Sequence, residues 1–143
     1  MATTIQIKNI PTGYQSIISN GRHAIVGDEP IKSKGTDLGF SPVEFILAGI
    51  SMCKVATVRN VARRKGWEIG NVDAELSQVV KRDLQGNLKT YIESAIHIEG
   101  DITEEQRALL IKEADNCYVT RMVKGEWHLS DSTALVEEMS LAE

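Results

Sequence analysis

Two cysteines, Cys53 and Cys117, are the side chains best suited to covalent chemistry in this sequence. Cys53 lies in a long apolar run, four residues after Gly49, so the two residues share a face if the run is helical. Glycine inside a helix costs about 1 kcal/mol relative to alanine, and its presence predicts that another group approaches this face closely. The face that carries Cys53 is therefore a candidate contact surface.

Cys117 directly follows Asp115 and Asn116. If Asn116 caps a helix, the Cys117 thiol lies in the first helical turn, where the helix dipole favours the thiolate. Buried cysteines are also ordinary small core residues. The residues alone leave two interpretations open, a reactive thiol pair and simple packing.

Other catalytic devices are missing from the sequence. It has no glycine-rich phosphate-binding motif and no Gly-x-Ser-x-Gly nucleophile elbow. The three histidines, His23, His97 and His128, lie far apart without a Cys-x-x-Cys motif beside them, so we expect no metal site and no cofactor. Nothing in the sequence pairs two carboxylates as a general acid and a general base.

The composition is that of one globular domain covering residues 1–143. Hydrophobic residues make up 42% of the chain and charged residues 25%, with a formal net charge of -4. The dense basic run is limited to Arg63-Arg64-Lys65, which argues against nucleic acid as a partner. The longest nearly apolar stretch, Phe45–Cys53, is far shorter than the roughly 20 residues of a membrane span. With no signal-peptide pattern and few cysteines, we expect a cytoplasmic protein.

The best-marked element is a helix from Pro42 to about Lys65. Ser41-Pro42-Val43-Glu44 combines an N-cap serine, a proline at the first helical position and a glutamate three residues after the cap. Gly66 suits the position just after the helix. Between Val43 and Val58 the helix is apolar nearly all round, and such a helix must be enclosed on every side. One chain of this size can hardly enclose it, so we expect a homodimer.

The remaining patterns predict strands first and helices later. The expected N-terminal strands lie around Ile5 and Ile7, at Tyr14–Ile18 and at Arg22–Val26, with a turn at Asn20-Gly21, and a long hairpin later turns at Leu84–Asn87. The capping box Thr103–Gln106 then opens a helix, and a short helix follows at Cys117–Val123. The last expected elements are a strand at Glu126–Leu129 and a short amphipathic helix from Asp131 through Leu135, Val136 and Met139. This order favours an α+β fold with antiparallel sheets.

The run from Ser41 to Cys53 resembles the central-helix motif of the OsmC/Ohr family, the osmotically inducible and organic hydroperoxide resistance proteins. In that family a proline and a glutamate open the helix, an Ala-Gly or Ala-Ala pair follows, and the peroxidatic cysteine lies four residues after the glycine position. Cys117-Tyr118-Val119 is similar to the family's second motif, Cys-Pro-Val. The order of elements is similar too, so the resemblance covers nearly the whole chain.

The resemblance implies an OsmC-like fold, with antiparallel sheets packed around a long buried central helix in an intertwined homodimer. It also implies that Cys53 attacks an organic hydroperoxide and becomes a sulfenic acid. Cys117 then forms a disulfide with it, which an external dithiol reduces. The two cysteines are therefore expected within disulfide reach of each other.

The sequence departs from the family pattern at three points, which place it closer to the divergent OsmC-like subgroup. Val43 stands where the family's best peroxidases have a glutamate, and Glu44 follows one position later. Glu44 is a candidate catalytic residue by this resemblance and a capping residue by the Ser-Pro-x-Glu pattern. Pro11-Thr12-Gly13 lacks the family's arginine, for which Arg22 is a weaker candidate, and Tyr118 replaces a proline.

Two functions remain open at this stage. The first is thiol-dependent reduction of organic hydroperoxides by Cys53 and Cys117, with Glu44 as a third candidate residue. The alternative is a dimer that binds a small apolar ligand at its interface, with cysteines that only pack.

Overall fold

Helix α1 (Pro42–Lys65) is the element around which the rest of the chain is arranged in this computed structural model, which describes residues 2–136. Its predicted start and end are confirmed. The Ser41 hydroxyl accepts the Glu44 amide, and the Glu44 carboxylate accepts the Ser41 amide at 3.0 Å, a complete capping box. Gly66 ends the helix in the left-handed conformation, with φ of 71°.

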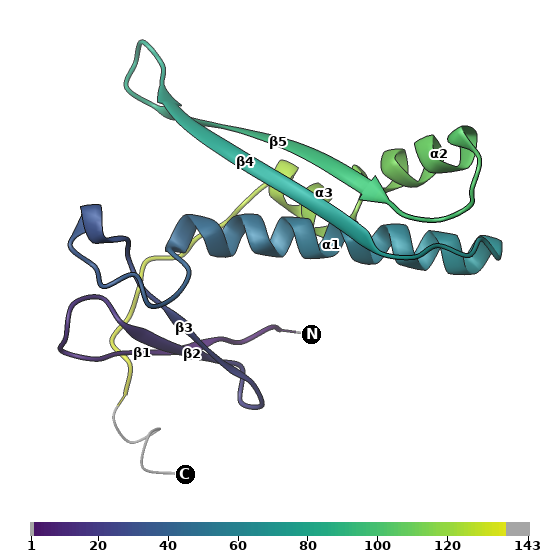
Figure 1. Cartoon of the computed structure of the whole chain (residues 1–143). Helices are drawn as coiled ribbons and strands as arrows, with labels where there is room; N and C mark the ends of the chain where they lie inside the picture. The colour runs from purple at the N-terminus through teal and green to yellow at the C-terminus, as the bar shows by residue number, and fades with distance from the viewer. Residues whose placement is uncertain (1, 137–143) are drawn as a thin grey trace.

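The long hairpin of β4 (Val72–Arg82) and β5 (Leu88–Ile98) crosses over α1 (Figure 1). The two strands pair antiparallel along their whole length, from Val72 opposite Ile98 to Arg82 opposite Leu88. Asp83 closes the turn by accepting the amides of Gln85 and Asn87. The turn therefore lies where the sequence predicts it, and the hairpin tip projects away from the other elements.

A separate antiparallel sheet lies on the other side of α1 from the hairpin (Figure 1). Its strands are β1 (Gln6–Asn9), β2 (Ser16–Ser19) and β3 (Ala24–Gly27), in that order. The β2–β3 turn is centred one residue later than the predicted Asn20-Gly21, on Gly21 and Arg22. The Asn20 amide donates to the His23 carbonyl, and the Asn20 side chain accepts two further turn amides, so Asn20 flanks the turn.

The connection from β3 to α1 includes the short 3-10 helix η1 (Ile31–Ser33) and is organised by Asp28. The Asp28 carboxylate accepts the amides of Glu29, Thr36 and Leu38 and the Thr36 hydroxyl. Asp28 is buried, so these hydrogen bonds compensate for the lost hydration of its charge. One side chain thereby holds a connection that the sequence shows only as irregular.

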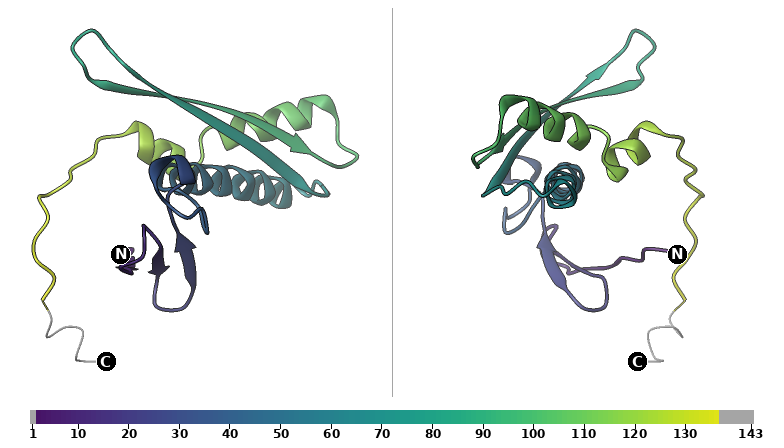
Figure 2. Two further views of the ribbon diagram at one scale, coloured as in Figure 1. Left: turned by 60° about the vertical axis from the view of Figure 1, so that its left-hand side comes forward. Right: turned by 90° about the vertical axis from the view of Figure 1, so that its right-hand side faces the viewer.

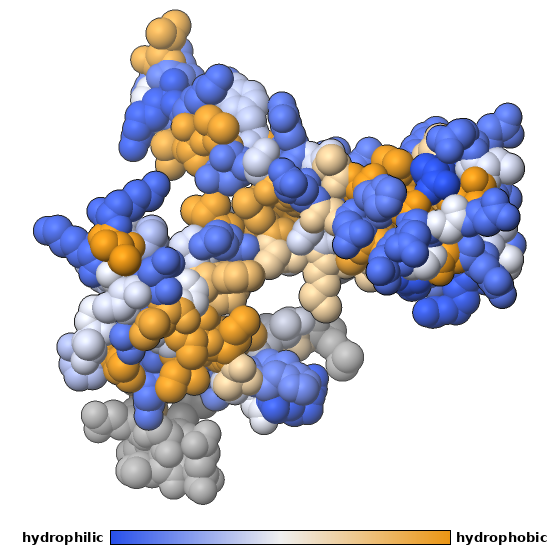
Figure 3. Space-filling view, viewed as in Figure 1, coloured by the Kyte–Doolittle hydropathy of each residue, from blue (hydrophilic) through white to orange (hydrophobic). Residues whose placement is uncertain are grey.

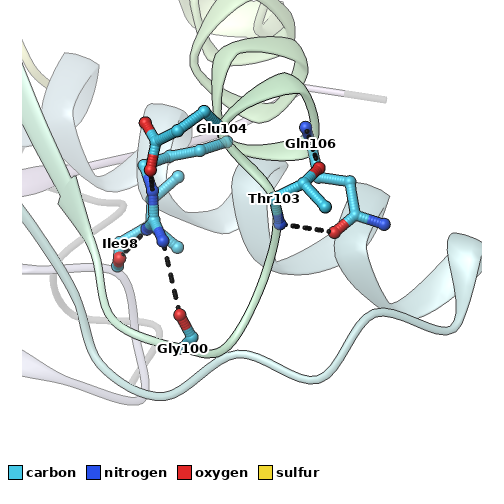
Figure 4. A network of polar contacts seen from close by, with 6 residues as sticks. Ile98, Gly100, Thr103, Glu104 and Gln106 are labelled. Atoms are coloured by element: carbon cyan, nitrogen blue, oxygen red, sulfur yellow. Dashed lines mark hydrogen bonds and ion pairs between the residues drawn. The ribbon is translucent and has the colours of Figure 1, made fainter.

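Helix α2 (Glu104–Ala114) begins at the predicted capping box of Thr103 and Gln106. Arg107 fastens this helix to the end of β5: its guanidinium donates to the carbonyls of Ile98 and Gly100 and pairs with Glu104 (Figure 4). Helix α3 (Tyr118–Lys124) follows after a short break and contacts α1. Two antiparallel sheets and these helices confirm the predicted α+β class.

The buried core lies around the C-terminal half of α1. Its members come from α1, β5 and α2 and are Val58, Val61, Ala62, Ile98, Leu110 and Ala114. The N-terminal half of α1 is covered on one side only, and the side chains of Ile46 and Met52 are 59% and 73% exposed. Figure 3 shows further exposed apolar side chains over the N-terminal sheet. This burial agrees with the expectation that one chain cannot enclose α1.

Among the described residues, α1 alone has the length and hydropathy of a membrane span, with a mean hydropathy of 1.3 over its most apolar window. The core helix of a soluble protein meets the same criteria, so this is weak evidence for a span.

The prediction of a strand at Glu126–Leu129 is wrong. The described segment after Gly125 forms neither strand nor helix and runs away from the other elements (Figure 2). Its alternating side chains favour a strand, but a strand also needs a neighbouring edge for its hydrogen bonds. Residues 131–136 are not helical, whereas Met139 of the predicted amphipathic helix lies outside the described residues.

Candidate functional site

Cys53 of α1 and Cys117 at the start of α3 both lie where α3 packs against α1. Cys53 is half-buried, and its Sγ accepts the amide of Val119 at 3.4 Å. Val119 lies two residues after Cys117, which is only 2% exposed. Both cysteines are free thiols. Two cysteines far apart in the sequence thus lie at the same contact between helices.

Cys117 occupies the N-cap position of α3, so the condition that Asn116 caps this helix is not met. The backbone of Cys117 is extended, with φ of -66° and ψ of 157°, and the helix begins at Tyr118. Asp115 and Asn116 complete the end of α2 instead, because their amides donate back to carbonyls of that helix. The Cys117 thiol consequently lies beside the first turn of α3 and is outside it.

The surroundings of Cys117 favour its thiolate. Burial raises the pKa of the Cys117 thiol, but the Thr120 hydroxyl and amide, the Cys53 thiol and the Lys54 ammonium together lower it below its ordinary value. The Thr120 hydroxyl lies 2.9 Å from Cys117 Sγ. A thiolate is the form of cysteine that acts as a nucleophile.

Lys54 and Asp115 form a charged pair next to the thiols that the sequence reasoning missed. Lys54 is only 5% exposed, and its Nζ lies 3.1 Å from Asp115 Oδ1. The Asp115 side chain is 63% exposed. A signal was present in the sequence, because a lysine within the apolar stretch of α1 needs an acidic partner if it is buried.

The structure places Glu44 away from the thiols of its own chain. It lies nine residues before Cys53, which corresponds to about 13 Å along a helix axis. Hydrogen bonds from the Ser41 amide and hydroxyl lower the pKa of Glu44, as expected for a carboxylate in the first turn of a helix. Arg22, the other candidate, lies in the β2–β3 turn.

Gly49 lies on an open surface of α1. A Cβ atom added there would meet no atom of the described residues within 4 Å. The close approach predicted from this glycine is therefore not made within one chain. The contact surface is free for a second molecule.

A groove of about 270 Å³ lies beside Thr120, whose hydroxyl contacts Cys117, and neither cysteine lines it. It is lined by apolar and polar side chains from α1, β5, α2–α3 and α3, namely Ile50, Lys54, Ile92, Ser94, Asp115, Thr120, Val123 and Lys124. A second pocket of about 290 Å³ lies under the N-terminal sheet, against Phe40 and Phe45, and no cysteine lines it. Within residues 2–136, no three His, Cys, Asp or Glu side chains lie together as a metal site would require.

Comparison with known families gives one match over most of the chain. The model of a family described as OsmC-like protein matches residues 35–130, a span that includes both cysteines and the Lys54–Asp115 pair. A search of curated protein sequences finds no match.

Solved structures share the fold at low sequence identity. An OsmC-like protein from Mycoplasma pneumoniae is similar with a TM-score of 0.73 and 18% identity, over 87% of this chain and 89% of that chain. An organic hydroperoxide resistance protein OsmC from Legionella pneumophila gives 0.67 and 16%, over 87% and 90%. The organic hydroperoxide resistance protein OhrB of Bacillus subtilis gives 0.64 and 16%, over 87% and 92%.

Proposed function

This chain belongs to the OsmC-like protein family, and from that membership we propose that it is a thiol-dependent peroxidase that reduces organic hydroperoxides. Similar structures carry the name of organic hydroperoxide resistance proteins, which supports a role in hydroperoxide resistance. The observation that carries the proposal is that Cys53 Sγ accepts the amide of Val119, two residues after Cys117, so that both cysteines lie where α3 packs against α1. Such a pair supplies both the attacking and the resolving thiol of a peroxidase cycle.

Cys53 is the peroxidatic residue in this proposal, because it is half-buried whereas Cys117 is almost inaccessible. The Cys53 thiolate attacks the outer oxygen of the hydroperoxide, and the O–O bond breaks. The alkoxide takes up a proton and leaves as an alcohol. Cys53 has lost two electrons and is a sulfenic acid.

Cys117 closes the cycle. Its thiolate attacks Cys53 Sγ, an S–S bond forms, and the hydroxyl group leaves as water after it takes up a proton. An external dithiol then reduces the disulfide by thiol exchange and is itself oxidised to a disulfide. The lowered pKa of Cys117 supports this role, because the attacking group must be a thiolate.

Alkyl hydroperoxides are the proposed substrates. The groove beside Thr120 has apolar side chains from Ile50, Ile92 and Val123, and the exposed side chains of Ile46 and Met52 extend the apolar surface of α1. Burial of an alkyl tail against such a surface makes binding more favourable, whereas hydrogen peroxide has no apolar part to bury. We place the protein in the cytoplasm as a homodimer, with no nucleic acid, membrane or cofactor as partner.

The test is peroxide consumption with dithiothreitol as the reductant. We expect faster turnover of cumene hydroperoxide than of hydrogen peroxide. Cys53→Ser should abolish turnover, because a serine hydroxyl is scarcely ionised near neutral pH. Cys117→Ser is the matched variant and should permit one oxidation of Cys53, which then stalls at the sulfenic acid or is oxidised further.

The proposed peroxidase activity would be overturned if the wild-type protein showed no turnover and both thiols titrated as ordinary buried cysteines. The second candidate function would then take its place, a dimer that binds a small apolar ligand. The pocket beside Phe40 and Phe45 favours that candidate, because its lining is mainly apolar. Binding of an apolar fluorescent probe that Cys53→Ser leaves unchanged would support it.

A further inference from the structure

The groove beside Thr120 combines apolar walls with an excess of positive charge. Its apolar side chains come from α1, β5 and α3 and are Ile50, Ile92 and Val123. The described charged groups that line it are the ammonium groups of Lys54 and Lys124 and the carboxylate of Asp115. Two cations against one anion leave an excess of positive charge, although the whole chain has a formal net charge of -4. This local excess favours an anionic ligand.

Lys54 is buried in this groove and has hydrogen-bond donors to spare. Its side chain is 7% exposed, and within residues 2–136 the one hydrogen-bond partner of its Nζ is Asp115 Oδ1, at 3.1 Å. An ammonium group has three N–H donors, so two are left for another acceptor. The Asp115 side chain is 63% exposed, and a partner in such contact with water compensates only partly for the burial of a charge. A second anion in the groove would complete that compensation.

Lys124 adds a second cation from a different helix. It is exposed, and it forms no ion pair with any other described residue. Because Lys54 and Lys124 line one groove of about 270 Å³, a small anion bound there experiences both charges. The hydroxyl groups of Ser94 and Thr120 also line the groove and can donate hydrogen bonds to the same anion.

The second pocket provides a contrast within the same molecule. The pocket beside Phe40 and Phe45 is also mainly apolar, but its charged lining residues are Asp28 and Glu29, and no basic residue of the described chain lines it. An anion is repelled there and attracted to the groove beside Thr120. Apolar walls in turn select against a small inorganic anion, which loses hydration in the groove and has no apolar part to bury.

We propose that the groove beside Thr120 is a binding site for a small amphipathic carboxylate, of the class of a medium-chain fatty acid anion. Its carboxylate accepts hydrogen bonds from the Lys54 ammonium and is attracted by Lys124, while its alkyl chain packs against the apolar side chains named above. The groove, at about 270 Å³, is just below the range of about 300–1,000 Å³ that drug-sized ligands occupy, which limits the length of the chain.

Binding at this site is measurable without a peroxide, because neither cysteine lines the groove. The inference deepens the proposed function, and it rests on that function only where the alkyl tail of a hydroperoxide occupies the groove. The carboxylate site itself is tested on the reduced protein alone.

The test is isothermal titration calorimetry of the reduced, full-length protein with octanoate. Two matched probes separate the contributions of charge and chain: 1-octanol keeps the alkyl chain without the charge, and acetate keeps the carboxylate without the chain. We expect octanoate to bind about tenfold or more tightly than either probe, because only octanoate uses both the lysines and the apolar walls.

Variants of the two lysines test where octanoate binds. Lys54→Met should weaken octanoate binding about tenfold or more, because it removes the buried donor, and should leave 1-octanol binding unchanged. Lys54→Arg should keep most of the affinity because it keeps the charge. Lys124→Glu reverses the exposed charge, should also weaken binding, and keeps the inference testable if circular dichroism shows that Lys54→Met does not fold. Lys89→Met is the control, since it removes an exposed lysine of β5 that does not line the groove.

The inference is overturned if octanoate and 1-octanol bind with equal affinity, or if the folded Lys54 and Lys124 variants bind octanoate as the wild type does. An equal loss of affinity in Lys89→Met would also overturn it, since binding would then follow the total charge of the protein. If octanoate binds and no peroxide is turned over, the proposed function fails and the site stands. If peroxide is turned over and octanoate does not bind, the site fails and the peroxidase stands.

Discussion

At the scale of single residues, two carboxylates stabilise the backbone around the start of α1 by accepting hydrogen bonds. Asp28 accepts four hydrogen bonds from the connection before α1, and Glu44 closes the N-terminus of α1. Both carboxylates have a lowered pKa, because these hydrogen bonds favour the ionised form. Neither residue needs a catalytic role to explain its environment within one chain.

Asp28 predicts a specific dependence of stability on pH. The Thr36 hydroxyl is the main cause that lowers the pKa of Asp28 from 3.8 to about 2. A carboxyl group whose pKa is lower in the folded state stabilises that state fully above its unfolded pKa, and the effect is lost as the pH falls through the folded value. The wild-type protein should therefore lose stability between about pH 4 and pH 2 through this group.

Asp28→Asn should remove that part of the pH dependence and lower the thermal midpoint at pH 7, since an amide cannot replace the charged acceptor. Thermal unfolding from pH 2 to pH 7 measures both effects. Asp73→Asn, an exposed change in β4, is the control and should leave the curve as in the wild type. If the thermal midpoints of Asp28→Asn and of the wild type changed in parallel with pH, Asp28 would not be the source of this pH dependence.

Glu44 is tested by a change that keeps its hydrogen bonds. Glu44→Gln should leave peroxide turnover nearly unchanged if the residue is only part of the capping box, because glutamine serves that motif equally well. Initial rates with cumene hydroperoxide measure this. A large loss of rate in a folded Glu44→Gln protein would instead identify Glu44 as a site residue. Glu44 would then act on the thiols of a second copy of the chain in the proposed homodimer.

At the scale of elements, the contact between α1 and α2 sets where Cys117 lies. Leu110 of α2 is fully buried against Val58 and its neighbours, and Arg107 fastens the other end of the helix to β5. Cys117 follows α2 after two residues, so the packing of α2 determines the approach of Cys117 to Cys53. The thiol pair is thus a product of core packing.

Leu110→Ala should lower the free energy of unfolding by about 2–5 kcal/mol, because it leaves a cavity in this core. It should also slow formation of the Cys53–Cys117 disulfide after a single addition of peroxide. Urea unfolding and a thiol count after oxidation measure the two effects. Leu84→Ala is the control at the exposed hairpin tip, where we expect a change below about 0.5 kcal/mol.

At the scale of the whole molecule, the exposed apolar surface exceeds what a water-soluble single chain usually presents. It includes Ile7, Ile17 and Ile25 of the N-terminal sheet and Met52 of α1, each 49–73% exposed. The open surface at Gly49 lies on the same helix. These features support the proposed homodimer, in which a second copy covers the N-terminal half of α1.

Sedimentation velocity should therefore show a dimer at low micromolar concentration, with unfolding that depends on protein concentration. Met52→Glu places a charge on the proposed interface and should weaken the dimer, whereas Leu84→Glu at the hairpin tip should not. A stable, folded monomer at low micromolar concentration would remove the homodimer.

The sequence by itself determined the elements whose signals are local. The capping boxes at Ser41 and Thr103, the glycine after Lys65 and the hairpin turn before Leu88 all lie where the residue pattern predicts them. Each signal depends on hydrogen bonds between residues a few positions apart, so the chain does not need the rest of the fold to express it. The α+β class followed from the order of these elements, and the family resemblance followed from the Ser41–Cys53 and Cys117–Val119 motifs together with that order.

Tertiary structure decided the site. The predicted strand at Glu126–Leu129 fails because no strand edge in the described chain accepts it, and Cys117 caps α3 because Asp115 and Asn116 complete α2. The hydrogen bond of Cys53 with Val119 and the pairing of Lys54 with Asp115 join residues more than sixty positions apart. Burial and charge pairing depend on which helices pack together, and that packing is a property of the folded chain that no local pattern contains.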